Sequence, residues 1–463
     1  MPGAYGPLPS LRHGVCAAVE FALLVGCFLA AVAIRFAGEP WLALGDYVGE
    51  GVLHALVVQV CLYYGDLYED SSMRRRMELF IRIGQCVALS TVLLALVFFL
   101  VPGFKIGRGI LFIFLPLALL SLLVWRLFYF WAWGSEALSD TALILGTGPS
   151  AQQVAREMLK RPFQGFKIVG FLGEHAAEVG RRLVNPSVIG TKAEILDVVK
   201  DQGVSMIIVA MDDRRGKLPV SDLLQCRLAG VRVEEATNFL ERMTGRILVR
   251  NLRPSWLVFS QGFNKPRLLM NSKRSAELVI AAVFAAIAAP VMALVAFLVR
   301  LEGHGPIFYR QERVGYQGRP FMLLKFRTMR ADAEASTGPV WASRGVDDRM
   351  TRIGRLLRKV RLDELPQLLN VLKGEMSFVG PRPERPHFVE QLRKIIPYYD
   401  ERHSVKPGIT GWAQIKFGYG SNIEDAEEKL QYDLYYVKHM SMRFDVGIIF
   451  DTLKVMVTGW GAR

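Results

Sequence analysis

Long apolar segments dominate the first third of the chain. Four of them are long enough to cross a hydrocarbon core of ~30 Å at ~1.5 Å per helical residue, at about 13–34, 43–64, 80–101 and 106–133. The pattern therefore predicts four transmembrane helices within residues 1–134. The first segment is followed by more apolar sequence rather than by a cleavage signal and a polar domain, so we expect it to be retained.

Cations between these segments indicate how they are oriented. Arg74, Arg75 and Arg76 lie between the second and third segments, whereas the other two short loops carry fewer cations. Because loops rich in lysine and arginine stay in the cytoplasm, this distribution places both chain termini there.

Short apolar runs separated by amphipathic segments begin at Thr141. The runs ALILG, KIVGFLG, VSMIIVAM and VRVEE are typical of strands in βαβ units. They predict a Rossmann-like α/β domain with a parallel sheet over 135–250, followed by a linker over 251–272. Gly146 and Gly148 form a GxGxxA turn, whose backbone amides can take a phosphate. The turn alone is a weak signal, and a regulatory or dimerising domain explains it equally well.

A fifth apolar run covers residues 278–299 and is interrupted by Pro290. Lys273 and Arg274 precede it and Arg300 follows it, so both flanks are basic. A straight spanning helix would put one basic flank on the wrong side of the membrane. The pattern favours a re-entrant helix that breaks at Pro290 and returns to the cytoplasmic side, with an ordinary kinked span as the alternative.

Most of the net positive charge lies in the last part of the chain, from residue 265 onward. The 463 residues are 51% hydrophobic and carry a formal net charge of +14, and residues 265–463 hold 31 of the 57 lysines and arginines against 21 of the 43 acids. A basic amphipathic helix is expected over 349–361, where cations can hold a domain on anionic lipid. Nucleic acid is the competing partner, but no nucleic-acid-binding module is visible and the cations adjoin membrane segments.

Four polar motifs lie in order in the last domain, which we place at 273–463. They are KFRTM (325–329), RLDELPQL (361–368), GPRPE (380–384) and PGITGWAQ (407–414). By contrast, the five scattered cysteines exclude a disulfide scaffold, and the lack of HExxH and GxxxxGK[ST] elements excludes zinc-protease and P-loop chemistry.

The second motif contains an adjacent acidic pair, Asp363 and Glu364. Phosphoryl transfer from a nucleoside diphosphate needs charge neutralisation, commonly by Mg²⁺ held through one or two carboxylates and by arginines. The pair can supply the carboxylates, and a carboxylate can also be the nucleophile. An isolated acidic pair usually only starts a solvated helix, but this pair lies among three other polar motifs beside an apolar anchor. The candidate cations for phosphate are Lys325, Arg327, Arg358 and Arg382.

Together the four motifs resemble the bacterial sugar transferase family, the polyprenyl-phosphate hexose-1-phosphate transferases, over residues 265–463. The preceding spans and α/β domain are similar to those of the long members. The resemblance implies that Asp363 is the nucleophile and contacts the metal, that Glu364 supports it, and that Arg358 and Arg382 contact phosphate. The fold class expected is a mixed membrane protein: a four-helix transmembrane bundle, a Rossmann-like α/β domain, and a re-entrant helix with a mainly helical, α+β cytoplasmic catalytic domain.

The activity implied by this resemblance is transfer of hexose 1-phosphate from a UDP-hexose to undecaprenyl phosphate in the bacterial inner membrane, with Mg²⁺ and release of UMP. This reaction begins exopolysaccharide or O-antigen synthesis, with glucose our first choice and galactose our second. Lys273 and Arg274 could meet the lipid phosphate or serve as simple interfacial anchors. Trp412, Phe417 and Tyr419 suit either an interfacial aromatic belt or the core, and we expect the core. After GWAQ the chain reads IKFGYG where many members have VNGR, so donor contacts there are expected to differ.

Two other functions remain as alternatives. A nonenzymatic membrane scaffold or sensor with a nucleotide-binding α/β domain leaves the four motifs unexplained. A membrane-bound nucleotide-sugar epimerase is disfavoured, because no tyrosine has a lysine four positions later. The oligomeric state, a homodimer included, stays open.

Overall fold

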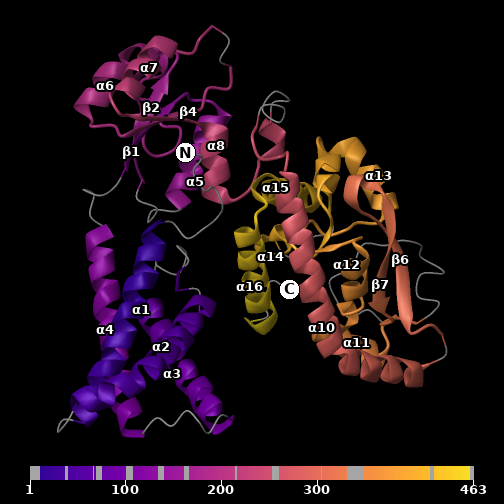
Figure 1. The fold of residues 1–463 in the computed structure, drawn as a ribbon. Helices are drawn as coiled ribbons and strands as arrows, with labels where there is room; N and C mark the ends of the chain where they lie inside the picture. Colours follow the sequence, from indigo (N-terminus) through magenta and orange to yellow (C-terminus); the bar gives the residue numbers. More distant parts are fainter. Residues whose placement is uncertain are drawn as a thin grey trace. The chain divides into compact units, whose positions relative to one another are not determined.

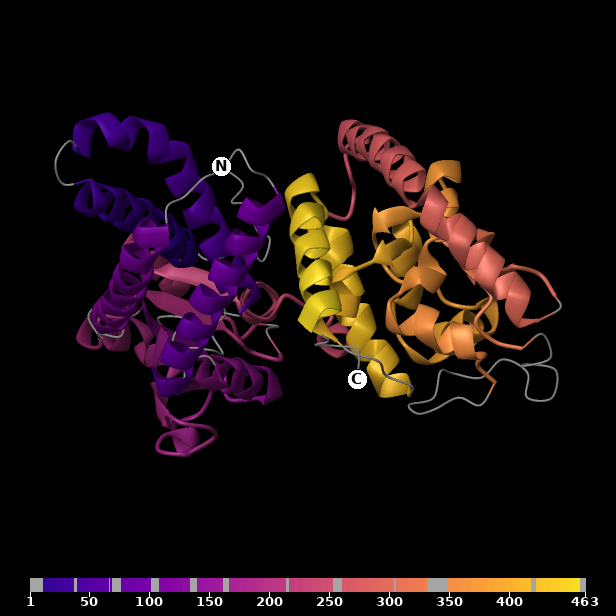
Figure 2. The ribbon, with the colours of Figure 1, turned by 90° about the horizontal axis from the view of Figure 1, so that it is seen from below.

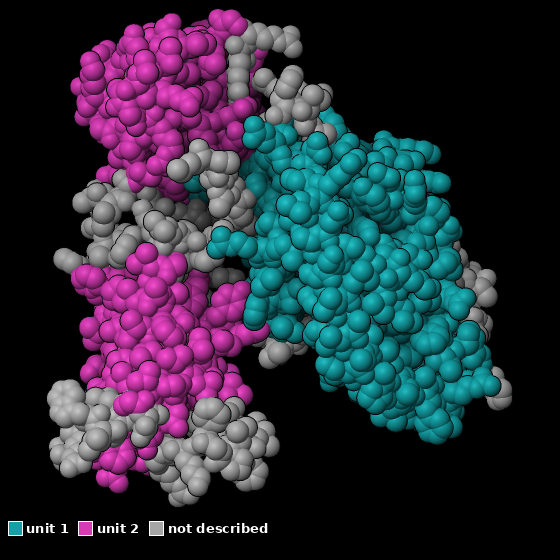
Figure 3. All heavy atoms as spheres, viewed as in Figure 1, with its two compact units in different colours: residues 1–6, 240–463 teal, residues 7–239 magenta. Residues whose placement is uncertain are grey.

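The structure is a computed structural model that describes most of the chain. The described residues are 11–36, 40–65, 67–68, 76–100, 108–133, 140–160, 166–213, 216–252, 260–303, 305–330, 349–417 and 422–458. They fall into two compact units, one with residues 240–463 and one with residues 7–239, drawn in teal and magenta in Figure 3. Each unit has hydrophobic clusters of its own.

Four long apolar helices form at the predicted places. They are α1 (Leu11–Arg35), α2 (Pro40–Tyr64), α3 (Arg76–Leu100) and α4 (Arg108–Trp133). α1 packs against α2 and α4, and α3 also contacts α2 and α4. By length and composition α1, α2 and α4 can cross a membrane, while the apolar stretch described in α3 is shorter. The prediction of several apolar helices that could span a membrane in this region is confirmed.

A buried ion pair lies among these helices. Arg126 of α4 and Glu20 of α1 approach to 2.6 Å, and both side chains are almost fully buried. Tyr68 donates a further hydrogen bond to Glu20, and Arg126 donates to the carbonyl of Leu67. Breaking one member of such a pair leaves an uncompensated charge, so the pair constrains how these helices pack.

The α/β domain contains the predicted parallel sheet. Its strands are β1 (Asp140–Leu145), β2 (Phe166–Gly173), β3 (Val188–Thr191), β4 (Met206–Val209) and β5 (Arg232–Glu235), in the order β3-β2-β1-β4-β5. Its helices are α5 (Pro149–Lys160), α6 (Ile195–Asp201), α7 (Val220–Leu228) and α8 (Ala236–Thr244). All described strand pairs are parallel. β1 lies between β2 and β4, which is the switch point where ligands bind in open α/β sheets.

The C-terminal unit begins with α10 (Arg267–Glu302), a 36-residue helix. It continues through Pro290, so the break predicted there is absent; a proline inside a helix removes one hydrogen bond and bends the helix instead. Figure 1 shows α10 changing direction along its length, and Figure 2 shows it running along one side of this unit.

Both ends of α10 pack on the same small domain. Near the N-terminal end Arg274 donates to the carbonyls of Val371 and Leu372, and near the C-terminal end Val295 and Val299 pack with other buried residues. Many large apolar side chains between these contacts remain exposed, including Val283, Phe284, Ile287, Leu294 and Phe297. A straight helix of this length would span roughly 54 Å.

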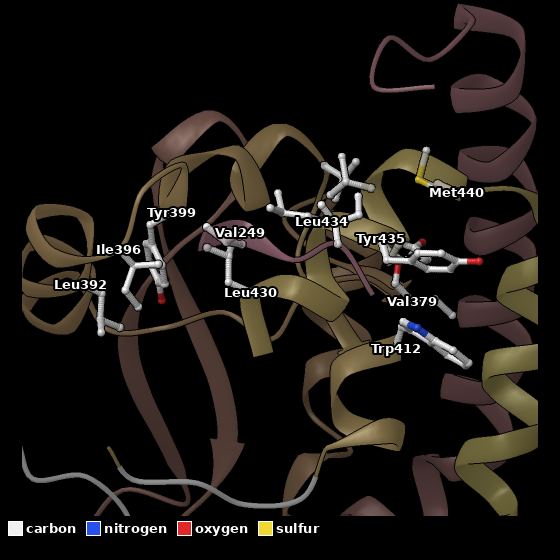
Figure 4. Packing of buried hydrophobic residues seen from close by; sticks show 14 of the residues in the cluster. Val249, Val379, Leu392, Ile396, Tyr399, Trp412, Leu430, Leu434, Tyr435 and Met440 are labelled. Atoms are coloured by element: carbon white, nitrogen blue, oxygen red, sulfur yellow. Dashed lines mark hydrogen bonds between the residues drawn. The ribbon is translucent and has the colours of Figure 1, made fainter. Parts of the chain in front are cut away.

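Short helices and strands complete this unit. They are β6 (Phe308–Val314), β7 (Pro320–Phe326), α11 (Arg352–Lys359), α12 (Gln367–Lys373), β8 (Ser377–Val379), α13 (Pro386–Ile395), β9 (Gly408–Thr410), α14 (Trp412–Lys416), α15 (Ile423–His439) and α16 (Met442–Thr458). β6 and β7 form an antiparallel hairpin, and β8 pairs with β9 in parallel. The core contains Trp412, as predicted, stacked on Tyr435 near Val379 (Figure 4).

Candidate active site

The acidic pair lies on a single 3-10 turn, Leu362–Glu364, between α11 and α12. The Thr351 side chain accepts a hydrogen bond from Gly354 and so caps the start of α11. Arg361 adopts a left-handed conformation with φ of 60° directly before the turn, and Pro366 precedes α12. This sharp reversal puts two adjacent carboxylates at the junction of two short helices, with Asp363 the more deeply buried.

Glu364 is held by two cations from distant parts of the chain. Lys325, on β7, places its Nζ 2.6 Å from Glu364 Oε1, and Arg382, in the loop after β8, donates to the same oxygen at 3.3 Å. Burial alone would raise the pKa of Glu364, but the charges of Lys325 and Arg382 outweigh burial and lower it. Glu364 is therefore ionised at any physiological pH, and three of the four motifs meet at this carboxylate.

Asp363 is in a different state. Within the described residues no side chain donates a hydrogen bond to its carboxylate. Burial raises its pKa, an effect that the nearby charges of Lys325 and Arg358 offset only in part. The Asp363 carboxylate also accepts a hydrogen bond from its own backbone N–H. A partly desolvated carboxylate without a side-chain donor is available to bond a substrate atom or a cation.

The loop that carries Arg382 is fixed by two arginines that the motifs did not reveal. Arg402 is almost fully buried, pairs with Asp433 at 2.7 Å and donates to the Arg382 carbonyl at 3.0 Å. Arg313 donates to the Pro383 carbonyl at 2.9 Å. These contacts hold the backbone of the loop from two sides. Arg402 precedes the PGITGWAQ motif by five residues, and no spacing rule singles it out.

Two other predicted site residues have their hydrogen bonds elsewhere, although the charge of Arg358 also acts on Asp363. Arg327 is buried and donates to the carbonyls of Val299 and Gly303, so it holds the end of α10. Arg358 is exposed on α11, with a contact from its guanidinium to the Met350 sulfur at 3.5 Å. Phosphate binding by Arg327 and by Arg358 stays a prediction.

The cations at the start of α10 are also engaged. Lys273 donates to Asp445 at 2.6 Å and to the Tyr436 hydroxyl at 2.9 Å, in a buried network. Arg274 donates to the carbonyls of Val371 and Leu372 at the end of α12. Each therefore has a packing role in addition to any contact with lipid.

The glycine turn of the α/β domain lies where it was predicted, between β1 and α5. Gly146 has φ of 124° and would carry a Cβ only 2.7 Å from the Ala210 carbonyl oxygen, so only glycine fits. The carboxylate of Asp212 packs directly on Gly148 and accepts a hydrogen bond from Ser150 at 2.5 Å. Asp212 thus occupies the anion position at the start of α5, and a phosphate there would have to displace it.

The side chains near the acidic pair can be compared with the ligands that a metal ion requires. The described residues hold no cluster of three or more His, Cys, Asp or Glu side chains that could bind a metal. Mg²⁺ commonly keeps several waters and binds through one or two carboxylates together with substrate phosphates. The carboxylate of Asp363 fits that manner of binding, since no described side chain donates a hydrogen bond to its oxygens.

Two family models match this chain. One, described as bacterial sugar transferase, covers residues 268–459, and the other, described as CoA-binding domain, covers residues 64–224. The first contains all four motifs and the acidic pair. The second ends within the α/β domain, after β4.

Three curated relatives illustrate the likeness. The UDP-N-acetylgalactosamine-undecaprenyl-phosphate N-acetylgalactosaminephosphotransferase of Aeromonas hydrophila is 40% identical over 52% of this chain and 56% of its own length. The UDP-glucose:undecaprenyl-phosphate glucose-1-phosphate transferase of Escherichia coli K12 is 33% identical over 67% of this chain and 66% of its own length. The protein of the same description from Caulobacter vibrioides is 39% identical over 44% of this chain and 76% of its own length. The chain thus spans less than two thirds of the first two.

Proposed function

The chain belongs to the bacterial sugar transferase family, and we propose that it transfers hexose 1-phosphate from a UDP-hexose to undecaprenyl phosphate, releasing UMP. The observation that carries this proposal is the acidic pair: Glu364 is kept ionised by Lys325 and Arg382, and the Asp363 carboxylate beside it is uncommitted among the described side chains. A binding scaffold would not need a buried carboxylate without a side-chain donor next to two cations.

The proposed reaction has two displacements at one phosphorus. A carboxylate oxygen of Asp363 bonds to the β-phosphorus of the UDP-hexose, the bond from that phosphorus to the bridging oxygen breaks, and UMP leaves with the bridging oxygen. An oxygen of undecaprenyl phosphate then bonds to the same phosphorus, and the bond to Asp363 breaks and restores the carboxylate. Lys325 and Arg382 lie where they can balance the charge of the phosphates, as a transfer of this type requires.

Mg²⁺ is the cofactor we propose, with Asp363 as its protein ligand. When bound, the ion would supply neutralisation of diphosphate charge. Glu364, already neutralised by Lys325 and Arg382, would orient the turn that carries Asp363.

The membrane placement we propose puts the α/β and catalytic domains in the cytoplasm, at the bacterial inner membrane. α10 would be re-entrant, with its exposed apolar middle in the bilayer. Contacts of both ends of α10 with one domain support this, because a straight spanning helix would carry one end roughly 30 Å away across the membrane. Exposed Leu356 and Val360, at the end of the basic helix α11, suit the same interface.

This topology predicts where thiol reagents can reach. Single cysteines at Asn264 and Arg319, on either side of α10 and in a background without the five native cysteines, should both be shielded from an impermeant reagent in intact cells. A cysteine at Gly103, in a loop that the charge pattern assigns to the opposite side, should be labelled and serves as control. Labelling at Arg319 with protection at Asn264 would establish a spanning α10 instead.

The donor sugar we propose is glucose, in the initiating step of exopolysaccharide or O-antigen synthesis. N-acetylgalactosamine is the second candidate, because the relative from Aeromonas hydrophila is described by that sugar at an identity similar to that of the glucose-described relative from Caulobacter vibrioides.

A direct assay tests the proposed function. Purified protein with undecaprenyl phosphate and Mg²⁺ should release UMP and form one lipid-linked sugar per UMP, and labelled UDP-glucose should react faster than UDP-galactose, UDP-N-acetylglucosamine or UDP-N-acetylgalactosamine. Release of UDP in place of UMP would identify a glycosyl transfer and overturn the proposal. A faster reaction with another of these sugars would change only the donor.

A further inference from the structure

A small pocket lies at the start of α10, away from the acidic pair. Its volume is about 40 Å³, and its polar lining consists of Lys273, Arg274, Glu277, Ser377 and Lys406. Met270, Val379, Val405 and Met440 complete the lining, so the wall is largely apolar and only the polar side chains can hold a small ligand group there. Lys406 comes from the segment just before the PGITGWAQ motif, far from α10 in sequence, and no function has been assigned to it above.

Two of these side chains neutralise each other. Lys273 uses its donors on the Val379 carbonyl, the Tyr436 hydroxyl and Asp445. Glu277 accepts a hydrogen bond from Ser377 and lies 3.7 Å from Lys273 Nζ. Neither Lys273 nor Glu277 is therefore available to a ligand.

The other two cations face the same space. An ideal Cβ built on Gly374 would lie 3.1 Å from an Arg274 guanidinium nitrogen and 3.6 Å from Lys406 Nζ. Each of the two terminal nitrogens of Arg274 donates one hydrogen bond to a carbonyl of α12. The guanidinium has further N–H groups that can donate to a ligand. Lys406 makes no hydrogen bond or ion pair with any residue that the structure describes. Burial and the charge of Arg274 lower the pKa of Lys406, which shows how poorly it is compensated.

The charges around this pocket leave one cation in excess. Lys273, Arg274 and Lys406 face two carboxylates, those of Glu277 and Asp445. Like charges brought together in a half-buried place are stabilised by an anion, and phosphate oxygens accept from both ammonium and guanidinium groups.

The position of the pocket along α10 suggests where that anion comes from. Arg274 lies one helical turn before Leu278, where the long run of exposed apolar side chains of α10 begins, although Leu268 in the first turn is exposed as well. Cations at such a boundary lie at the depth of lipid head groups. α12, seven residues and roughly 10 Å long, separates Arg274 from the acidic pair, so an anion in the pocket is too far away to react at Asp363.

We propose that Lys406 and Arg274 bind the phosphate group of a membrane lipid and thereby hold the start of α10 at the head-group layer. The proposal rests on the membrane placement of α10 given above and does not depend on the transfer reaction. A phospholipid and undecaprenyl phosphate waiting to react share the required chemistry, and the experiment separates them.

The test measures lipid binding to the full-length protein in neutral detergent, without a nucleotide sugar, by native mass spectrometry. The probes are phosphatidylglycerol, undecaprenyl phosphate and, as a lipid without phosphate, diacylglycerol. Lys406→Met should weaken binding of at least one phosphate lipid roughly tenfold or more. Lys406→Arg should retain most of the binding, and Lys394→Met, which removes an exposed lysine on α13, should change nothing.

Each outcome decides one point. Loss for phosphatidylglycerol alone identifies a phospholipid site, and loss for undecaprenyl phosphate identifies a waiting position for the acceptor. Wild-type binding of both lipids by a folded Lys406→Met protein overturns the proposal. Lys406→Gln, which keeps a polar end, replaces that variant if its thermal midpoint falls. Because no donor is present, a protein inactive in transfer still gives a clear answer.

Discussion

Asp363→Asn should lower the rate of hexose 1-phosphate transfer by several orders of magnitude, roughly 10³-fold or more. Asparagine keeps the size of the side chain but cannot attack phosphorus and is a poor ligand for Mg²⁺. Because no described side chain donates a hydrogen bond to the Asp363 carboxylate, the loss cannot be ascribed to a broken side-chain hydrogen bond. Initial rates of UMP release and of lipid-linked sugar formation measure it.

The matched control is Asp400→Asn, which removes an exposed acid paired with Arg393 at 2.9 Å. Exposed pairs contribute little, so this variant should remain within about twofold of the wild type. An Asp363→Asn enzyme that retained a tenth of the wild-type rate would place the nucleophile elsewhere.

A second measurement separates a nucleophile from a metal ligand at Asp363. With UDP-sugar and no lipid acceptor, a covalent route releases one UMP per enzyme and leaves the sugar phosphate on the peptide that contains Asp363. Initial-rate lines should then be parallel. Intersecting lines with no trapped adduct would indicate direct attack by the lipid phosphate, with Asp363 serving only to bind the metal.

The sequence predicted which residues form the active site, but not which of them contact one another. The adjacent acids and the cations Lys325 and Arg382 could be chosen from their motifs, because each motif is short and chemically distinctive. Nothing in the spacing shows that Lys325 and Arg382 meet at one oxygen of Glu364. That meeting depends on β7 and on the loop after β8, whose relative positions are long-range properties of the fold.

Arg327 shows that two residues of one motif can contact different parts of the structure. Lys325 and Arg327 are two residues apart and would share one face of an extended strand. β7 ends at Phe326, however, and Arg327 turns to the carbonyls that end α10. Side chains alternate between the two faces only within the strand, and the sequence does not show that the strand ends at Phe326.

Long-range acids were the hardest partners to foresee. The glycine turn was placed correctly between strand and helix, but Asp212, which occupies its anion position, lies more than 60 residues later. The sequence predicts Lys273 as a lipid-phosphate contact or an interfacial anchor, and it gives no sign of the partner Asp445 on α16. The short strand β3 was missed as well, since it holds only two apolar residues, includes Gly190 and follows Pro186, a composition that is also typical of a loop.

Lys325→Met should reduce kcat/KM roughly 10²-fold at neutral pH. It should also move the acid limb of the pH profile of kcat/KM to higher pH. Lys325 is the nearest cation to Glu364 and also lowers the pKa of Asp363. Methionine keeps the volume of the side chain but removes the charge, while the burial that raises both carboxyl pKa values remains.

The direction of the pH effect follows from which form is active. Both carboxylates must be ionised, so activity is lost as the pH falls through their pKa values. In the wild type the pKa of Glu364 is lowered, so its protonation does not affect the pH–rate profile near neutrality. The pKa of Asp363 is raised, so the acid limb of that profile lies above the usual range of an aspartate. Without Lys325 both values rise, and the limb shifts upward.

Two variants and one further measurement make this prediction specific. Lys325→Arg keeps the charge and should preserve the wild-type pH profile even if its rate is lower, while Lys394→Met removes a lysine on α13 and should leave both unchanged. A thermal midpoint close to the wild type shows that the methionine variant is folded. If that folded variant lost activity with an unshifted profile, Lys325 would act only by contacting substrate. Arg382, 3.3 Å from the same oxygen, would then be the group that keeps Glu364 ionised.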